Sequence, residues 1–167
     1  HMIKTAIFDF DGTLADTIPL CLEAFRRAVN DLDGRVLTDR EIERNFGPDD
    51  LGVIRKLFPG KPEWHEHGRE LFIHYYQELH AEMAPAPFPG TVELLHSLRN
   101  SGIRLAMVTG KRRESADISL KFFHLDGFFP VLETGSPEGG VKTDRINRAL
   151  KRLGASAREA VYIGDSP

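Results

Sequence analysis

This sequence has a single cysteine, no long apolar run and no excess of positive charge. Each of these shortages excludes a class of protein. Its single cysteine, Cys21, allows no intrachain disulfide and no zinc site built from several thiolates, and it suits a reduced, cytoplasmic setting. No apolar run approaches the ~18 residues that span a bilayer, so we expect no membrane partner. Lys and Arg number 22 against 25 Asp and Glu, which argues against nucleic-acid binding by bulk positive charge.

The composition is otherwise that of a globular protein with a substantial core, because 41% of the residues are hydrophobic and 28% are charged. Short apolar runs, typical of strands buried on both faces, alternate with helical segments. This alternation is typical of βαβ units and predicts an α/β fold with a Rossmann-like parallel sheet. The expected strands cover residues 5–10, 103–109, 128–133 and 160–164, and the expected helices between them cover 91–100, 113–123 and 143–153.

A helical block interrupts this alternation after the first strand. Its first helix has one apolar face, formed by Ile18, Leu22, Phe25, Val29 and Leu32. Residues 38–41 match a capping box, which predicts the start of another helix, and a proline-rich linker at 85–90 ends the block. We therefore expect an inserted all-helical cap domain over residues 16–86 and an α/β core domain over residues 2–15 and 87–167.

Polar, reactive residues follow the expected strands at their carboxyl ends, where open parallel sheets bind ligands. They are Asp9 and Asp11 after the first strand, Thr109 and Gly110 after the second, Lys142 before the helix that follows the third, and Asp165 after the fourth. Two carboxylates so close together would repel unless a cation lay beside them, and Mg²⁺ prefers oxygen ligands. A carboxylate with metal, hydroxyl and lysine neighbours is suited to covalent phosphoryl transfer.

The same residues carry a family resemblance. The string DFDGTLAD at residues 9–16 resembles the first motif of the haloacid dehalogenase superfamily of phosphohydrolases. Thr109 in VTG, Lys142, and Asp165 in YIGDSP resemble the second, third and fourth motifs, in family order. The helical block resembles the helical (C1-type) cap of the phosphoglycolate phosphatase and pyrophosphatase branch. This resemblance covers nearly the whole chain and implies a Mg²⁺-dependent phosphatase of a small phosphorylated metabolite, as a monomer or homodimer.

The resemblance implies a role for each matching residue. Asp9 would attack phosphorus and form an aspartyl-phosphate, and Asp11 would act first as general acid and then as general base. Thr109 and Gly110 would bind the phosphoryl group, whose charge Lys142 would neutralise together with that of Asp9. An acid at position 11 favours phosphate-ester or phosphoanhydride chemistry, because the dehalogenases of the superfamily lack one there.

The resemblance also implies a magnesium site and structure beyond the sequence given. Asp9, Asp11 through its backbone carbonyl, and Asp165 would hold Mg²⁺, which stabilises charge on the transferring group. A second acidic residue would follow a few positions after Asp165, and more α/β structure would follow that. We therefore expect the core to be incomplete at residue 167 and the sequence to belong to a longer protein.

A loop in the helical block is expected to select the substrate. By resemblance, the loop FGPDD at residues 46–50 reaches into the active site, with Gly47, Pro48 and Asp49 at its centre. It contains no Lys or Arg, although Arg44 and Arg55 flank it. Its acids disfavour a second phosphate nearby, so the sequence favours a small phosphomonoester over a bisphosphate or a pyrophosphate.

Other conspicuous residues receive structural interpretations. Lys111 begins a basic run of three residues that is expected at the solvated start of a helix, with a contact to a distal anion of the substrate as the alternative. Cys21 is expected to be a small apolar filler. Trp64, Phe72 and Tyr75 are expected in the buried stripe of a long cap helix.

Alternative functions stay open at this point. A phosphomutase of the β-phosphoglucomutase type shares the core motifs, but the cap loop lacks a basic residue to hold a distal phosphate. A non-catalytic phosphoacceptor resembling response-regulator receivers also combines acids, a hydroxyl and a lysine on a parallel sheet, but it has no helical insert. A degenerate family member would bind phosphate without reacting.

Overall fold

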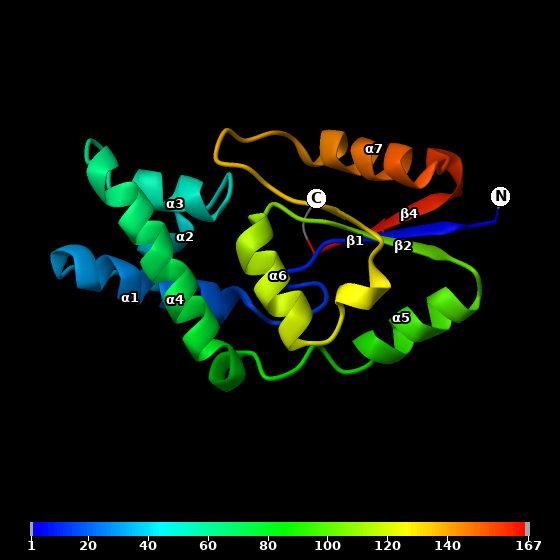
Figure 1. Cartoon of the computed structure of the whole chain (residues 1–167), viewed down its shortest axis with the longest axis horizontal. Coiled ribbons are helices and arrows are strands. Elements are labelled where there is room, and N and C mark those ends of the chain that lie inside the picture. The colour runs from blue at the N-terminus through cyan, green and yellow to red at the C-terminus, as the bar shows by residue number, and fades with distance from the viewer. Residues whose placement is uncertain (1, 166–167) are drawn as a thin grey trace.

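A four-stranded parallel sheet in the order β3-β2-β1-β4 forms the centre of the molecule, as the computed structural model, which describes residues 2–165, shows (Figure 1). In the shared register, Phe8 of β1 lies opposite Met107 of β2 and Ile163 of β4. The carboxyl ends of these strands therefore meet at one edge, as the sequence predicted. The strands are β1 (Thr5–Phe8), β2 (Arg104–Val108), β3 (Val131–Glu133) and β4 (Ala160–Ile163).

Both faces of the sheet are covered by helices (Figure 1). Ala6 and Phe8 of β1 point to the face that carries α5 (Thr91–Asn100) and α6 (Arg113–Phe122). Ile7 points to the opposite face, where Ala149 and Leu150 of α7 (Lys142–Leu153) cover it. This two-sided burial explains why the strands are continuous apolar runs rather than alternating ones. The α/β prediction is confirmed.

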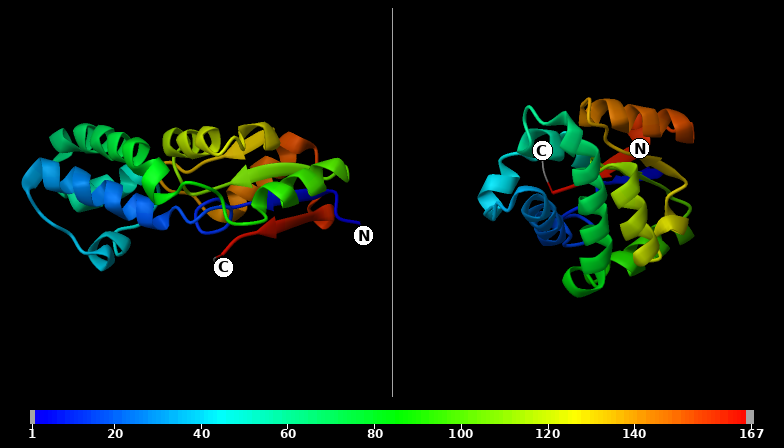
Figure 2. Two further views of the ribbon diagram at one scale, coloured as in Figure 1. Left: turned by 90° about the horizontal axis from the view of Figure 1, so that it is seen from below. Right: turned by 60° about the vertical axis from the view of Figure 1, so that its left-hand side comes forward.

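The remaining helices lie between β1 and α5 in the chain and gather at one end of the molecule (Figure 2). We call them the cap helices: α1 (Ile18–Asp33), α2 (Asp39–Glu43), α3 (Asp50–Leu57) and α4 (His65–Met83). The predicted capping box at the start of α2 is present, because Thr38 Oγ1 accepts from the Glu41 backbone N–H while the Glu41 side chain accepts from the Thr38 N–H. In the part of the chain that the structure describes, no helix combines the length and apolarity needed to cross a membrane.

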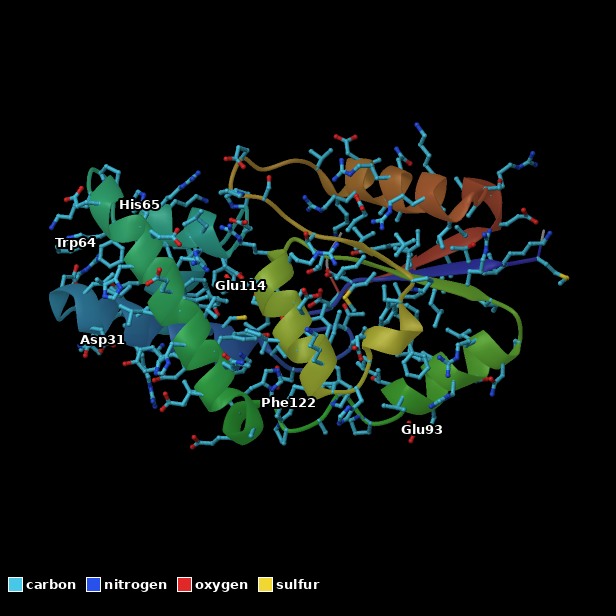
Figure 3. The ribbon with its side chains drawn as sticks, viewed as in Figure 1. Asp31, Trp64, His65, Glu93, Glu114 and Phe122 are labelled. Atoms are coloured by element: carbon cyan, nitrogen blue, oxygen red, sulfur yellow. The ribbon has the colours of Figure 1, made fainter. Side chains whose placement is uncertain are left out.

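Helix α6 makes several polar contacts with helix α4 of the cap helices. The hydroxyl of Tyr76 lies 2.5 Å from Ser119 Oγ, and His80 Nε2 lies 2.8 Å from the same oxygen. Arg69 of α4 also forms an ion pair with Glu114, which lies at the start of α6 next to α4 (Figure 3). Tyr76 and His80 are buried at these contacts, and the predicted Phe72 is buried as well, whereas the predicted Tyr75 is only partly buried.

One buried cluster runs from the cap helices into the sheet. It includes Phe25 and Phe72 of the cap helices together with Phe8 and Met107 of the sheet. The division into a cap domain at 16–86 and a core domain at 2–15 and 87–167 therefore stays a prediction, because the packing does not separate the two parts.

Candidate active site

A cavity of about 400 Å³ lies between the carboxyl edge of the sheet and the cap helices. It brings together every residue that the sequence predicted for the site except Lys142. The predicted residues that line it are Asp9, Asp11, Gly47, Pro48, Asp49, Thr109, Gly110 and Asp165. Phe46 and Asp50 belong to the loop that the sequence predicted to reach the site, whereas the other lining residues were not singled out for it: Ile18, Cys21, Phe25, Val53 and Lys111.

Asp9 is held at the end of β1 by its own backbone. Its N–H donates to the carbonyl of Ile163 at 2.9 Å, which continues the pairing of β1 with β4, and its Oδ1 accepts from the N–H of Phe10 at 2.7 Å. Burial raises the pKa of the Asp9 carboxyl, and the neighbouring carboxylates of Asp11 and Asp165 raise it further. A cation close to Asp9 would therefore favour its ionised, nucleophilic form.

Asp11 is fixed from two sides. The hydroxyl of Thr17 donates to its Oδ1, and the ammonium of Lys111 lies 3.5 Å from its Oδ2. The next residue, Gly12, has a φ of 79°, and a Cβ there would lie 2.3 Å from Asp165 Oδ2. Only glycine therefore allows both the turn after Asp11 and the close approach of Asp165.

Thr109 ends β2 with its hydroxyl buried at the cavity. Its N–H donates to the carbonyl of Glu133 at 3.0 Å, and its Oγ1 accepts from the N–H of Lys111 at 3.1 Å. The hydroxyl hydrogen can therefore point into the cavity and donate to a ligand oxygen. The loop behind it packs tightly, because a Cβ on Gly135 would lie 2.0 Å from the carbonyl oxygen of Gly110.

Gly135→Ala is expected to lower the free energy of unfolding by about 1–3 kcal/mol, because the added methyl group must displace the backbone at Gly110. Gly127→Ala is the matched control, since a Cβ there meets no atom within 4 Å. Urea unfolding monitored by circular dichroism measures both variants. Equal unfolding midpoints for the two would contradict the tight packing of this loop.

Lys142 lies beside the site rather than in the cavity lining. It is the first residue of α7, which begins one residue before the expected start at 143. Its ammonium lies 5.1 Å from the centroid of the Tyr162 ring, and its charge lowers the pKa of Asp9. The predicted role of Lys142 in neutralising the phosphoryl group stays a prediction, supported by this influence on Asp9.

The structure contradicts the expectation that Lys111 is a solvated residue. It was expected at a solvated helix start, but its side chain is only 1% exposed. Its ammonium lies 3.2 Å from Cys21 Sγ and 4.5 Å from the centroid of the Tyr76 ring, in addition to its contact with Asp11. Burial opposes its charge, yet Asp11 and the other neighbours hold the pKa of Lys111 well above its ordinary value. The available signal was its position, two residues after Thr109 at the carboxyl edge of the sheet.

Both aspartates of the cap loop accept hydrogen bonds from other parts of the protein. Asp49 Oδ1 accepts from the N–H of Gly52 at 2.8 Å and so caps helix α3. Asp50 is buried and accepts from the hydroxyl of Ser115 on α6. Both still line the cavity. They therefore make its cap side anionic while anchoring the loop to α3 and α6.

The oxygen atoms at the sheet edge suit a hard divalent cation. Among residues 2–165, no three His, Cys, Asp or Glu side chains converge as a metal-binding group. The predicted donor set of two carboxylates, Asp9 and Asp165, with the backbone carbonyl of Asp11 stays a prediction; the Asp11 side chain itself contacts Thr17 and Lys111. An all-oxygen set of this kind fits Mg²⁺.

Comparisons with known proteins place this geometry in a family. Residues 6–167 match the family model of the haloacid dehalogenase-like hydrolases. The chain is 30% identical over 168 residues to pyrophosphatase PpaX of Halalkalibacterium halodurans, an alignment that covers 98% of this chain and 75% of that protein. The structure is similar to that of Rhodobacter sphaeroides CbbY in complex with phosphate (TM-score 0.81, 24% identity, 96% of this chain and 77% of that one). It is also similar to a predicted phosphoglycolate phosphatase of Haemophilus somnus (TM-score 0.78, 20% identity, 96% and 76%). At these identities the two structures establish the fold alone.

The fourth motif lies at the limit of the described residues. Asp165 is placed at the cavity, whereas Ser166 and Pro167, which complete the predicted motif, lie outside the described residues.

Proposed function

The chain belongs to the haloacid dehalogenase-like hydrolases as a phosphatase, and we propose that it cleaves a small phosphomonoester through an aspartyl-phosphate on Asp9, with Mg²⁺ bound. The observation that carries this proposal is one cavity lined by Asp9, Asp11, Thr109 and Asp165. These groups supply a nucleophile, an acid, a hydrogen-bond donor and a metal-binding oxygen within a single site.

In the first step, a carboxylate oxygen of Asp9 attacks phosphorus while the bond from phosphorus to the leaving oxygen breaks. Asp11 donates its proton to that oxygen, so the product leaves as an alcohol. The Thr109 hydroxyl and the Gly110 backbone orient the phosphoryl oxygens, and Lys142 offsets their charge. In the second step, Asp11 takes a proton from water, which attacks phosphorus and releases phosphate from Asp9.

Asp9, Asp165 and the carbonyl of Asp11 would hold Mg²⁺, whose charge reduces the repulsion between the Asp9 carboxylate and the anionic phosphoryl group when it is bound. The raised pKa of Asp9, which burial and the two neighbouring carboxylates cause, supports a cation at this position.

Removal of Mg²⁺ with EDTA is expected to lower phosphate release about a hundredfold or more, and added Mg²⁺ should restore it. The measurement is phosphate release from a panel of phosphorylated metabolites with and without the metal. Full turnover in metal-free buffer would contradict the proposed cation site.

The substrate panel also separates the alternatives. The engaged acids Asp49 and Asp50 face the cavity, so we favour a phosphomonoester over pyrophosphate, although the PpaX relative is named a pyrophosphatase. If pyrophosphate is turned over fastest, that preference is wrong. Isomerisation of glucose 1-phosphate without phosphate release would indicate the phosphomutase, and a long-lived aspartyl-phosphate without turnover would indicate a phosphoacceptor.

A further inference from the structure

The two walls of the cavity differ in chemistry. The wall formed by the sheet edge is polar and consists of Asp9, Asp11, Thr109, Lys111 and Asp165. The side formed by the cap helices and the loop before α3 carries Ile18, Cys21, Phe25, Phe46 and Val53, which we call the apolar wall, beside the carboxylates of Asp49 and Asp50. A phosphoryl group bound at Asp9 therefore places its leaving group between the reacting residues and an apolar surface.

Two arginines lie near the cavity without lining it: the charge of Arg112 lowers the pKa of Asp49, and a Cβ on Gly110 would lie 3.9 Å from a guanidinium nitrogen of Arg145. Among the described residues, Lys111 is the one Lys or Arg that lines the cavity, and its ammonium already contacts Asp11 and Cys21. Of the two arginines that flank the cap loop, Arg44 lines a separate hollow, and Arg55 lies 4.0 Å from Glu138. A negatively charged leaving group would thus meet the carboxylates of Asp49 and Asp50 and no arginine in the lining, which is costly in a partly desolvated site.

Phe46 is the accessible part of the apolar wall. Its side chain is 37% exposed, whereas Phe25 behind it is 2% exposed and stacks on Phe72 with ring centroids 4.1 Å apart. The rings of Phe46 and Phe25 lie 6.4 Å apart. The Phe46 N–H donates to the carbonyl of Glu43 at 3.0 Å, which fixes its position after α2. An apolar ligand group can therefore cover Phe46 while a rigid aromatic pair supports it.

We propose that the cavity selects phosphomonoesters whose leaving group is uncharged and apolar, and that Phe46 is the residue that determines this specificity. The inference rests on the proposed phosphatase function and names the substrate class of the same site. It differs from a preference for pyrophosphate or a carboxylated phosphoester, whose leaving groups are anionic.

The test compares four substrates with wild-type protein in Mg²⁺: 2-phenylethyl phosphate, ethyl phosphate, phosphoglycolate and pyrophosphate. The first is expected to have the highest kcat/KM, about tenfold or more above ethyl phosphate, because its ring covers Phe46. Phosphate release is measured for each substrate under identical conditions.

Phe46→Ala is expected to lower kcat/KM for 2-phenylethyl phosphate about tenfold, mainly through KM, and to change that for ethyl phosphate less than twofold. Phe88→Ala is the matched control, because Phe88 is 38% exposed and lies outside the cavity lining; it should change neither value. Phe46→Arg is expected to raise kcat/KM for phosphoglycolate, since a guanidinium pairs with a carboxylate, and to lower kcat/KM for 2-phenylethyl phosphate.

The outcomes separate the inference from the function on which it rests. If the wild type hydrolyses phosphoglycolate or pyrophosphate best, or if Phe46→Ala affects all esters equally, the inference is overturned and the phosphatase function stands. If no ester releases phosphate in Mg²⁺, the proposed function fails, and the inference fails with it.

Discussion

Asp9→Asn is expected to lower kcat for phosphate release by about a thousandfold or more, while the fold is retained. The amide oxygen of asparagine carries no negative charge, so it cannot displace the leaving group and form an acyl phosphate. The substitution keeps the shape of the side chain and its hydrogen bond from the N–H of Phe10. Loss of activity would therefore reflect the missing nucleophile rather than a disturbed strand end.

Asp16→Asn is the matched control for this variant. Asp16 lies in the same segment, but it is exposed and does not line the cavity, so its replacement should leave kcat within about twofold. Mass spectrometry after an acid quench should find one added phosphoryl group on the wild type and none on Asp9→Asn. Wild-type turnover by Asp9→Asn would show that another group attacks phosphorus.

Local signals in the sequence were sufficient for the sheet edge. Asp9, Asp11 and Thr109 follow short apolar runs that can only be buried strands, and parallel strands bring their carboxyl ends together. The Thr38 capping box was equally predictable, because both of its hydrogen bonds join residues three positions apart. In each case, the information that fixes the residue lies within a few positions of it.

Features that depend on distant residues were not predictable in this way. The buried polar contacts of Tyr76 and His80 on α4 are made with Ser119, which lies 43 and 39 positions away. The expected third strand begins later, at Val131, because Asp126–Phe128 forms a short 3-10 helix first. Lys111 lies 90 positions from Cys21, so this contact cannot be read from neighbouring residues. The basic run around Lys111 is typical of an exposed segment and therefore did not indicate a buried charge.

The buried charge of Lys111 connects Asp11, the proposed general acid, to the cap helices. Its ammonium lies between Asp11 of the sheet edge and Cys21 of α1, and the Asp50 carboxylate also acts on it. Asp50 in turn binds Ser115 of α6. Lys111 therefore balances two carboxylates that would otherwise repel each other across the boundary between the sheet and the cap helices.

Lys111→Met is expected to lower the free energy of unfolding by roughly 3 kcal/mol, because it leaves Asp11 and Asp50 without their shared cation in a buried site. Lys121→Met is the control, since Lys121 is an exposed lysine on α6, and it should change stability by less than about 0.5 kcal/mol. Urea unfolding midpoints measure both variants. A Lys111→Met protein as stable as the wild type would show that this charge contributes nothing to holding the two carboxylates.

A double variant separates the lost charge from the lost volume. If the cost of Lys111→Met comes from the uncompensated carboxylate of Asp50, Asp50→Asn added to Lys111→Met should recover part of the stability, although Asp50→Asn alone should be destabilising. A cost caused by packing would instead add to that of Asp50→Asn. Because methionine nearly matches the length of the lysine stem, the coupling between these two positions reports how strongly the charge of Lys111 ties the cap loop to the sheet edge.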